Sequence, residues 1–69
     1  MNNPIVPAVE PIVEKVLEWT ITRDSEDIAI LMKWISEADK KRERETLIER
    51  TRELLAEIEH ATRRLDEMR

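Results

Sequence analysis

The feature that most restricts the fold of this 69-residue chain is the complete lack of glycine. Phosphate-binding loops, the dinucleotide fingerprint and the tight turns of most β-hairpins all need glycine, because other residues disfavour a positive φ angle. The sequence is instead rich in Glu, Arg, Leu, Ile, Ala and Lys, which are helix formers. Charged and hydrophobic residues each make up 41%, a balance that favours helices over disorder. We therefore predict an all-α protein with a single helical domain over residues 1–69.

The chain is short for a protein that folds alone. A domain of this size buries only about 60% of the surface that its unfolded form exposes, so a monomer would have little stability. The sequence contains no cysteine, which excludes disulfides and thiolate zinc sites. Helix packing or association between chains is then the expected source of stability.

Three prolines mark the first segment, residues 1–22. Proline is tolerated in the first turn of a helix, so we expect an amphipathic helix that begins near Pro7 or Pro11. Its apolar residues recur every three or four positions and form one face. They are Val9, Ile12, Val13, Val16 and Leu17, followed by either Thr20 or Ile21. A turn is expected over residues 22–25, since Asp24 or Ser25 could cap the next helix.

A long second helix is expected over residues 25–69. Its first apolar stripe is wide, which predicts contact with two neighbours. The stripe comprises Ile28, Ile30, Leu31, Met32, Trp34, Ile35 and Ala38. Residues 39–46 are almost all charged but include neither Gly nor Pro, so a continuous helix is the simplest interpretation. The alternative is a bend near residues 36–46, with a cap at Ser36 or Asp39, which would give three helices.

The sharpest pattern in the chain is a heptad repeat near its C-terminus. We call these residues the C-terminal seam: Leu47, Thr51, Leu54, Ile58, Ala61, Leu65 and Met68. Extending the repeat backwards places Lys40 and Arg44 at core positions, out of phase with the upstream stripe. The two stripes therefore face different partners, or the helix bends between them. We predict that the seam is an oligomer interface, in a helical hairpin or a coiled-coil-like homodimer or larger assembly.

Two patterns point to ligands other than protein. Glu57 and His60 form a Glu-x-x-His step, which supplies metal ligands in ferritin-like half-bundles. A single copy in a chain with 12 glutamates is also what chance would give, so we predict no metal or other cofactor. The basic cluster at residues 40–44 could contact phosphate, as in a small helical nucleic-acid-binding dimer. Glutamates interrupt it and residues 1–38 carry a net charge of −4, so a solvated surface is the preferred interpretation.

The remaining chemistry favours binding over catalysis. One histidine, two serines and no cysteine offer no evident nucleophilic triad, and we predict a protein that is not an enzyme. Trp19 and Trp34, the only aromatic residues, fit a helix crossing in the core or, as the functional alternative, exposed interface anchors. Together with Glu14 and Glu18 of the acidic first helix, they are the candidate partner-binding residues.

The function predicted from these patterns is that of a self-associating protein-interaction module: an adaptor, an assembly factor or a small inhibitor. No segment reaches the ~18 apolar residues of a membrane span, and no signal-peptide pattern precedes the first helix. We expect a soluble, cytoplasmic protein.

Overall fold

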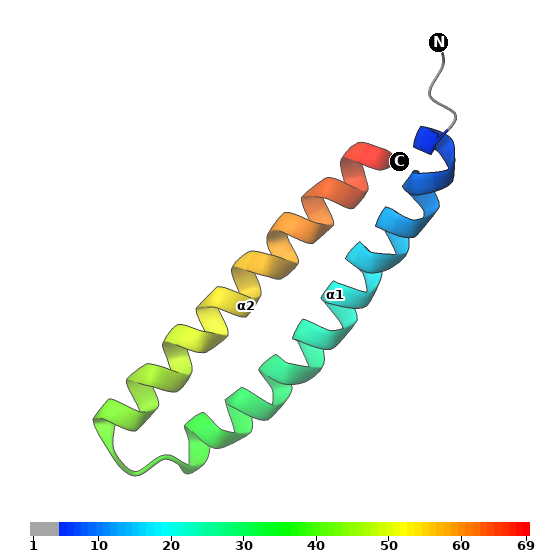
Figure 1. The fold of residues 1–69 in the computed structure, drawn as a ribbon. Helices are drawn as coiled ribbons and strands as arrows, with labels where there is room; N and C mark the ends of the chain where they lie inside the picture. Colours follow the sequence, from blue (N-terminus) through cyan, green and yellow to red (C-terminus); the bar gives the residue numbers. More distant parts are fainter. Residues whose placement is uncertain (1–4) are drawn as a thin grey trace.

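The computed structural model describes the backbone of residues 5–69 and the side chains of residues 11–69. Helix α1 spans Ile5–Glu37 and helix α2 spans Lys41–Met68. The two helices run antiparallel and form an elongated hairpin with extents of 60 × 16 × 15 Å (Figure 1). The predicted all-α class is confirmed in its helical-hairpin form. Within residues 5–69, no helix has the combination of length and apolar composition that crossing a membrane requires.

The turn expected over residues 22–25 is wrong, because α1 continues through this segment. Ser25 does not cap a new helix; its hydroxyl donates a 2.7 Å hydrogen bond to the carbonyl oxygen of Ile21, one turn earlier. A serine side chain that could cap the start of a helix thereby has its hydrogen bond satisfied in the interior of a helix. Asp24 also lies within the helix and is buried. The expected division at residues 22–25 is therefore replaced by a helix that begins at Ile5, with the first break after Glu37.

The chain reverses over residues 38–40, so the continuous helix through the charged segment is also wrong. The break lies inside the bend that was the alternative, but the residue that precedes α2 is Lys40, not Ser36 or Asp39. Lys40 has an extended backbone, with φ −97° and ψ 136°. The reversal needs no glycine because no described residue takes a positive φ.

Hydrogen bonds replace a glycine-based cap at this turn. The amide of Ala38 donates to the carbonyl oxygen of Ile35 at 3.3 Å, which tightens the end of α1. The Arg44 amide donates to Lys40 O at 3.0 Å, and the Arg44 guanidinium donates through Nη1 to Ala38 O at 2.9 Å. Most of the stability of a helix in a protein comes from packing its apolar face, and reversal lets the two apolar stripes cover each other.

The C-terminal seam packs against α1 of the same chain. Four of its residues are buried, namely Thr51, Leu54, Ala61 and Leu65, and the other three are half-buried. The facing residues of α1, here the α1 seam, also follow alternating spacings of four and three. They are Leu17, Ile21, Asp24, Ile28, Leu31, Ile35 and Ala38. Matching heptads on antiparallel helices are the pattern of coiled-coil packing.

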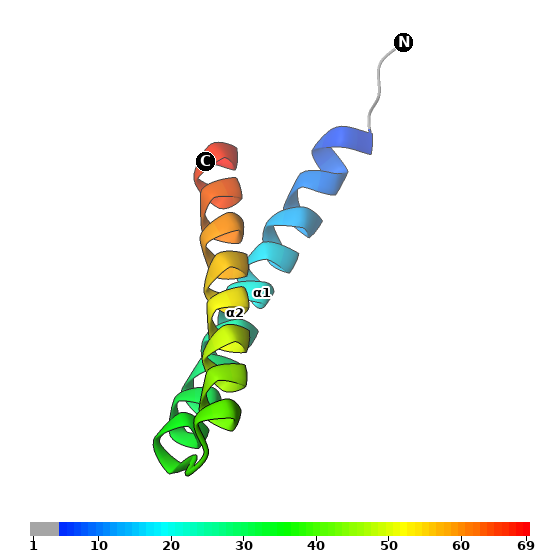
Figure 2. The ribbon, with the colours of Figure 1, turned by 90° about the vertical axis from the view of Figure 1, so that its left-hand side faces the viewer.

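The two helices are not equally close along their length. Figure 2 shows that the N-terminal part of α1 diverges from the C-terminal part of α2, so the hairpin is closed at the turn and wider at the opposite end. With only two helices, the core is a single layer of side chains between them. Such a layer leaves the outer sides of both helices in solvent.

Candidate protein-binding surface

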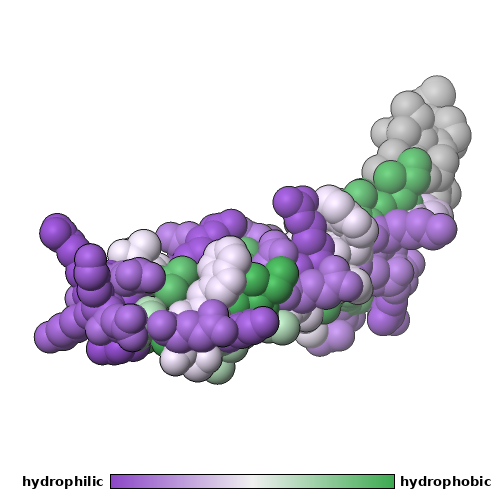
Figure 3. Space-filling model, turned by 90° about the horizontal axis from the view of Figure 1, so that it is seen from below, coloured by the Kyte–Doolittle hydropathy of each residue, from purple (hydrophilic) through white to green (hydrophobic). Residues whose placement is uncertain are grey.

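A second line of residues, outside the seam, follows the length of α1. Its apolar members recur at helical spacing and stay largely exposed: Ile12 at 63%, Val16 at 53%, Trp19 at 58%, Ile30 at 48% and Trp34 at 52%. Arg23 and Asp27 occupy the middle of the same line. We call these seven residues the outer stripe. Figure 3 shows one face of the molecule, on which hydrophobic patches reach the surface between hydrophilic side chains.

The outer stripe borders a groove between α1 and α2. Its central cavity, of about 190 Å³, has a polar lining that includes Arg23, Asp24 and Glu57. Toward the turn it adjoins a cavity of about 310 Å³, which Ile30, Trp34 and other residues line. The two cavities share Asp27, Arg50 and Leu54. Toward the open end a third cavity, of about 380 Å³, shares Thr20 and Glu57 with the central one. The groove thus has apolar walls at both ends and charges in the middle.

Three carboxylates, Asp24, Asp27 and Glu57, line the central cavity, and we call them the acidic notch. Asp24 sits at a seam position, is only 6% exposed, and has an oxygen, Oδ2, without a hydrogen-bond partner. A buried polar atom without a partner is unfavourable, so this carboxyl group is a potential binding point.

Glu57 responds to this neighbour. Its pKa is raised above the ordinary value, first by a hydrogen bond between its carboxyl group and that of Asp24, and then by the repulsion between the two charges. Loss of contact with water adds to the rise, and the charge of Arg50 opposes it. The folded chain therefore favours the protonated form of Glu57 more than the unfolded chain does.

The two arginines that line the central cavity make other contacts. The Arg50 guanidinium donates through Nη1 to Glu53 Oε1 at 2.9 Å. The guanidinium carbon of Arg23 lies over the indole ring of Trp19, 5.1 Å from its centroid. None of the ion pairs found among residues 11–69 involves the carboxylates of the acidic notch.

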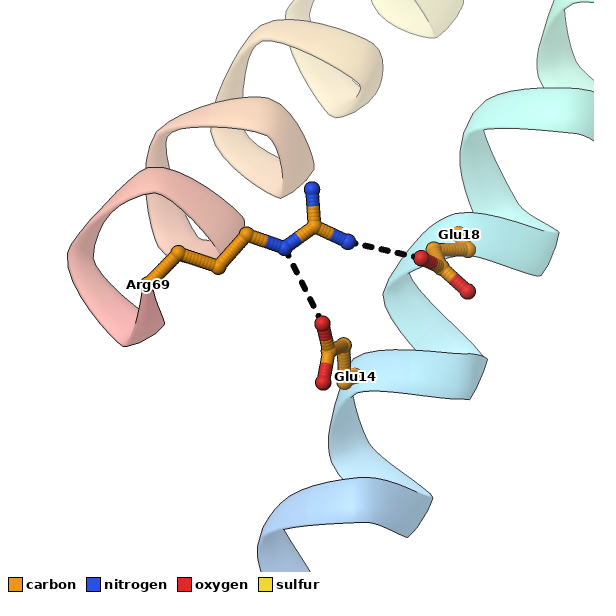
Figure 4. Close-up of polar contacts among 3 residues, drawn as sticks. All are labelled: Glu14, Glu18 and Arg69. Atoms are coloured by element: carbon orange, nitrogen blue, oxygen red, sulfur yellow. Dashed lines mark hydrogen bonds and ion pairs between the residues drawn. The ribbon is translucent and has the colours of Figure 1, made fainter.

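Of the predicted partner-binding residues, Glu14 and Glu18 bind within the chain. Arg69 donates from Nε to Glu14 Oε2 at 3.0 Å and from Nη2 to Glu18 Oε2 at 2.7 Å (Figure 4). These carboxylates raise the pKa of the Arg69 guanidinium. The two ion pairs connect the helices at the open end of the hairpin.

Trp19 and Trp34 are not core residues, so the interpretation that they pack at a helix crossing in the core is wrong. Both are more than half exposed and lie on the outer stripe. The C-terminal seam, by contrast, faces α1, as described above. Its role as an interface between chains stays a prediction.

The Glu-x-x-His step adjoins the notch through Glu57, whereas the basic cluster at residues 40–44 does not line the central cavity. Glu57 and His60 line the third cavity together, but in residues 11–69 no group of three or more His, Asp or Glu side chains is arranged to hold a metal ion. Arg44 of the basic cluster caps the end of α1, as described above.

The acidic notch was missed in the sequence, although a signal for it exists. Extending the stripe of Ile28 and Leu31 backwards in steps of four and three reaches Asp24, Ile21 and Leu17 in phase. The expected turn at residues 22–25 interrupted this extension and assigned Asp24 to a cap.

Exposed aromatic residues, a groove and a buried carboxyl group thus meet on one side of the hairpin. Comparison with protein-family models, with curated proteins and with solved structures finds no match for this chain.

Proposed function

We propose that the protein is a non-enzymatic protein-interaction module that self-associates, with the outer stripe of α1 as its contact surface. The observation that supports this most is the exposure of Trp19 and Trp34 beside an α1 seam that already packs against α2. Tryptophan is enriched among the residues that dominate binding energy at interfaces. Apolar side chains repeated at helical spacing are also the usual contact set when a helix lies in a groove.

The outer stripe fits self-association better than the C-terminal seam does. Using the seam between chains would require the hairpin to open and to lose Leu54 and Leu65 from its core, where they are 2% and 6% exposed. The outer stripe needs no opening, because its side chains already reach solvent. Two hairpins that meet there would form a four-helix assembly with both seams intact.

The biological role that follows is that of an adaptor, an assembly factor or a small inhibitor that works as an assembled particle. We place it in the cytoplasm as part of the same proposal, since the chain has none of the disulfides that stabilise many small secreted domains.

Sedimentation equilibrium from about 1 to 100 μM tests the proposal, because a specific helical dimer forms within this range. Trp34→Glu places a charge on the outer stripe, and Leu55→Glu is the matched control. Leu55 is 51% exposed, against 52% for Trp34, but lies outside the groove. We expect the unaltered protein and the control to contain more than one chain per particle, and Trp34→Glu to be monomeric with unchanged helicity.

A strictly monomeric unaltered protein at 100 μM would contradict the proposal. Association that survives Trp34→Glu but is lost with Leu55→Glu would move the interface to the other side of the hairpin.

A further inference from the structure

The outer stripe has nearly the same order of side chains in both directions. Val16 and Trp19 precede Arg23, Ile30 and Trp34 follow Asp27, and Ile12 extends the stripe beyond this symmetric part toward the N-terminus. Measured from residue 25, Arg23 and Asp27 are equally distant, as are Val16 and Trp34. A surface of this kind is complementary to a copy of itself turned end to end, provided that the two central charges are opposite, as they are here.

The central charges also lack partners of opposite sign in the single chain. Arg23 is exposed and is held over Trp19, and the ion pairs among residues 11–69 include neither Arg23 nor Asp27. Arg23 lies at the edge of the cavity that holds the acidic notch, which Asp24, with its buried and unpartnered Oδ2, also lines. Each hairpin therefore presents an exposed cation beside a cavity with three carboxylates and one further arginine, Arg50.

We propose that two copies pair through antiparallel α1 helices and that Arg23 of each copy enters the acidic notch of the other. This assignment rests on the self-association proposed above and gives it a geometry. Antiparallel pairing about residue 25 places Arg23 opposite Asp27, with the Asp24 carboxyl group beneath. It also places Val16 opposite Trp34 and Trp19 opposite Ile30, so apolar contacts flank the ion pairs at both ends.

Charge decides the direction of pairing. In a parallel pair Arg23 would face Arg23 and Asp27 would face Asp27, and like charges in contact oppose association. A guanidinium suits the notch because its five N–H donors can bind two carboxylates at once. The buried Asp24 oxygen then gains the donor that it lacks in the single chain.

Occupation of the notch by Arg23 would lower the raised pKa of Glu57, since a nearby positive charge favours the ionised carboxylate. Dimer affinity should therefore increase as the pH rises through the range in which Glu57 loses its proton. The charged groups that face this site are Arg23, Asp24 and Asp27 from α1 and Arg50, Glu53 and Glu57 from α2.

A charge-swap experiment tests the pairing directly. Arg23→Asp and Asp27→Arg are prepared separately, with Arg52→Asp as a control that makes the same charge change as the first variant at an exposed site outside the groove. Sedimentation equilibrium is run on each variant and on a one-to-one mixture of the two swaps, after circular dichroism has shown equal helicity.

We expect each swap alone to weaken self-association at least about tenfold, because like charges then meet twice across the two-fold axis. The mixture should form a heterodimer, because each aspartate of one variant then faces an arginine of the other. Position 23 of each chain lies opposite position 27 of its partner. The Arg52→Asp control should associate like the unaltered protein.

The outcomes separate the two proposals. Dimers of the unaltered protein that persist in both swaps, or swaps that do not rescue each other, would overturn the antiparallel pairing and leave the outer-stripe interface standing. Preferential pairing of Arg23→Asp with the unaltered protein, in which Arg23 would face an Asp at position 23, would indicate parallel pairing instead. A monomeric unaltered protein would overturn both.

Discussion

Asp24 is the residue at which folding and binding requirements conflict. A leucine at this seam position would bury apolar surface, whereas the carboxylate is buried at 6% exposure with one oxygen unpartnered. Replacing buried charged groups by apolar residues of similar size is often neutral or stabilising. Because this carboxylate lowers the stability of the single chain, we expect it to make a contact that the single chain does not show.

The first prediction concerns this conflict. Asp24→Leu should raise the free energy of unfolding by about 1–3 kcal/mol, because the desolvated carboxylate is removed and the seam becomes continuous. Urea denaturation at low micromolar concentration, where single chains dominate, would measure it. The control is Asp39→Leu in the exposed turn, which should stay within ~0.5 kcal/mol. A loss of stability in Asp24→Leu would mean that the carboxylate has a partner in solution that favours the folded hairpin.

The second prediction concerns Glu57 and pH. The folded state raises the pKa of this carboxyl group above its ordinary value of 4.5, so the folded chain binds the proton more tightly than the unfolded chain does. This contribution to stability is fully present below the ordinary pKa and is lost as the pH rises through the raised one. The difference in unfolding free energy between the unaltered protein and Glu57→Gln should therefore change with pH in that window and be flat above it. A difference that is constant from pH 4 to 7 would contradict the raised pKa of Glu57.

At the scale of single helices, a leucine-to-alanine substitution should change the unfolding free energy much more on the buried side of α2 than on its exposed side. Leu54 and Leu55 are neighbours in sequence, but Leu54 is 2% exposed in the seam and Leu55 is 51% exposed. Leu54→Ala should lower the unfolding free energy by about 2–5 kcal/mol through lost burial and the cavity left behind. Leu55→Ala should change it by no more than ~0.5 kcal/mol. Equal effects, read from chemical denaturation, would contradict the register of the hairpin.

The sequence predicted the helices better than it predicted their ends. The heptads from Leu47 to Met68 identified the buried face of α2 because a seven-residue repeat depends on side-chain type alone. A turn was predicted at residues 22–25, but the helix continues there and the Ser25 hydroxyl bonds to the carbonyl oxygen of Ile21. The chain instead reverses at residues 38–40, which contain neither Gly nor Pro. A serine hydroxyl can cap the start of a helix or bond to the carbonyl oxygen one turn earlier inside a helix. Only packing against a distant segment decides between these two arrangements.

The candidate site was predictable in part. Trp19 and Trp34 were predicted either as core residues or as exposed interface anchors, and they are exposed; their role in binding stays a prediction. What separates the two interpretations is the position of α2, which covers the α1 seam and leaves the outer stripe free. The acidic notch combines residues more than 30 positions apart, Asp24 and Glu57, and local patterns cannot bring these together.

For the whole molecule, the relevant feature is the width of the apolar surface on α1, which α2 covers only in part. The broad arc over residues 28–38 predicted two neighbours, and α2 is one of them. The second neighbour remains a prediction, and the outer stripe indicates where it would lie. Stability measured on dilute protein should therefore be lower than stability measured on concentrated protein, because association stabilises the folded state by mass action.

The single reversal of the chain also sets an order of events in folding. Ile35 and Leu47 flank the turn and lie close in sequence, whereas Arg69 and Glu14 are separated by 55 positions. The entropy lost in closing a loop increases with its length, so contacts beside the turn form more readily than contacts at the far end. We expect helix pairing to start at residues 38–40 and to proceed toward Arg69, whose ion pairs form last and break first. Asp24 lies partway along this route, so the hairpin can close around the turn before its buried carboxyl group is desolvated.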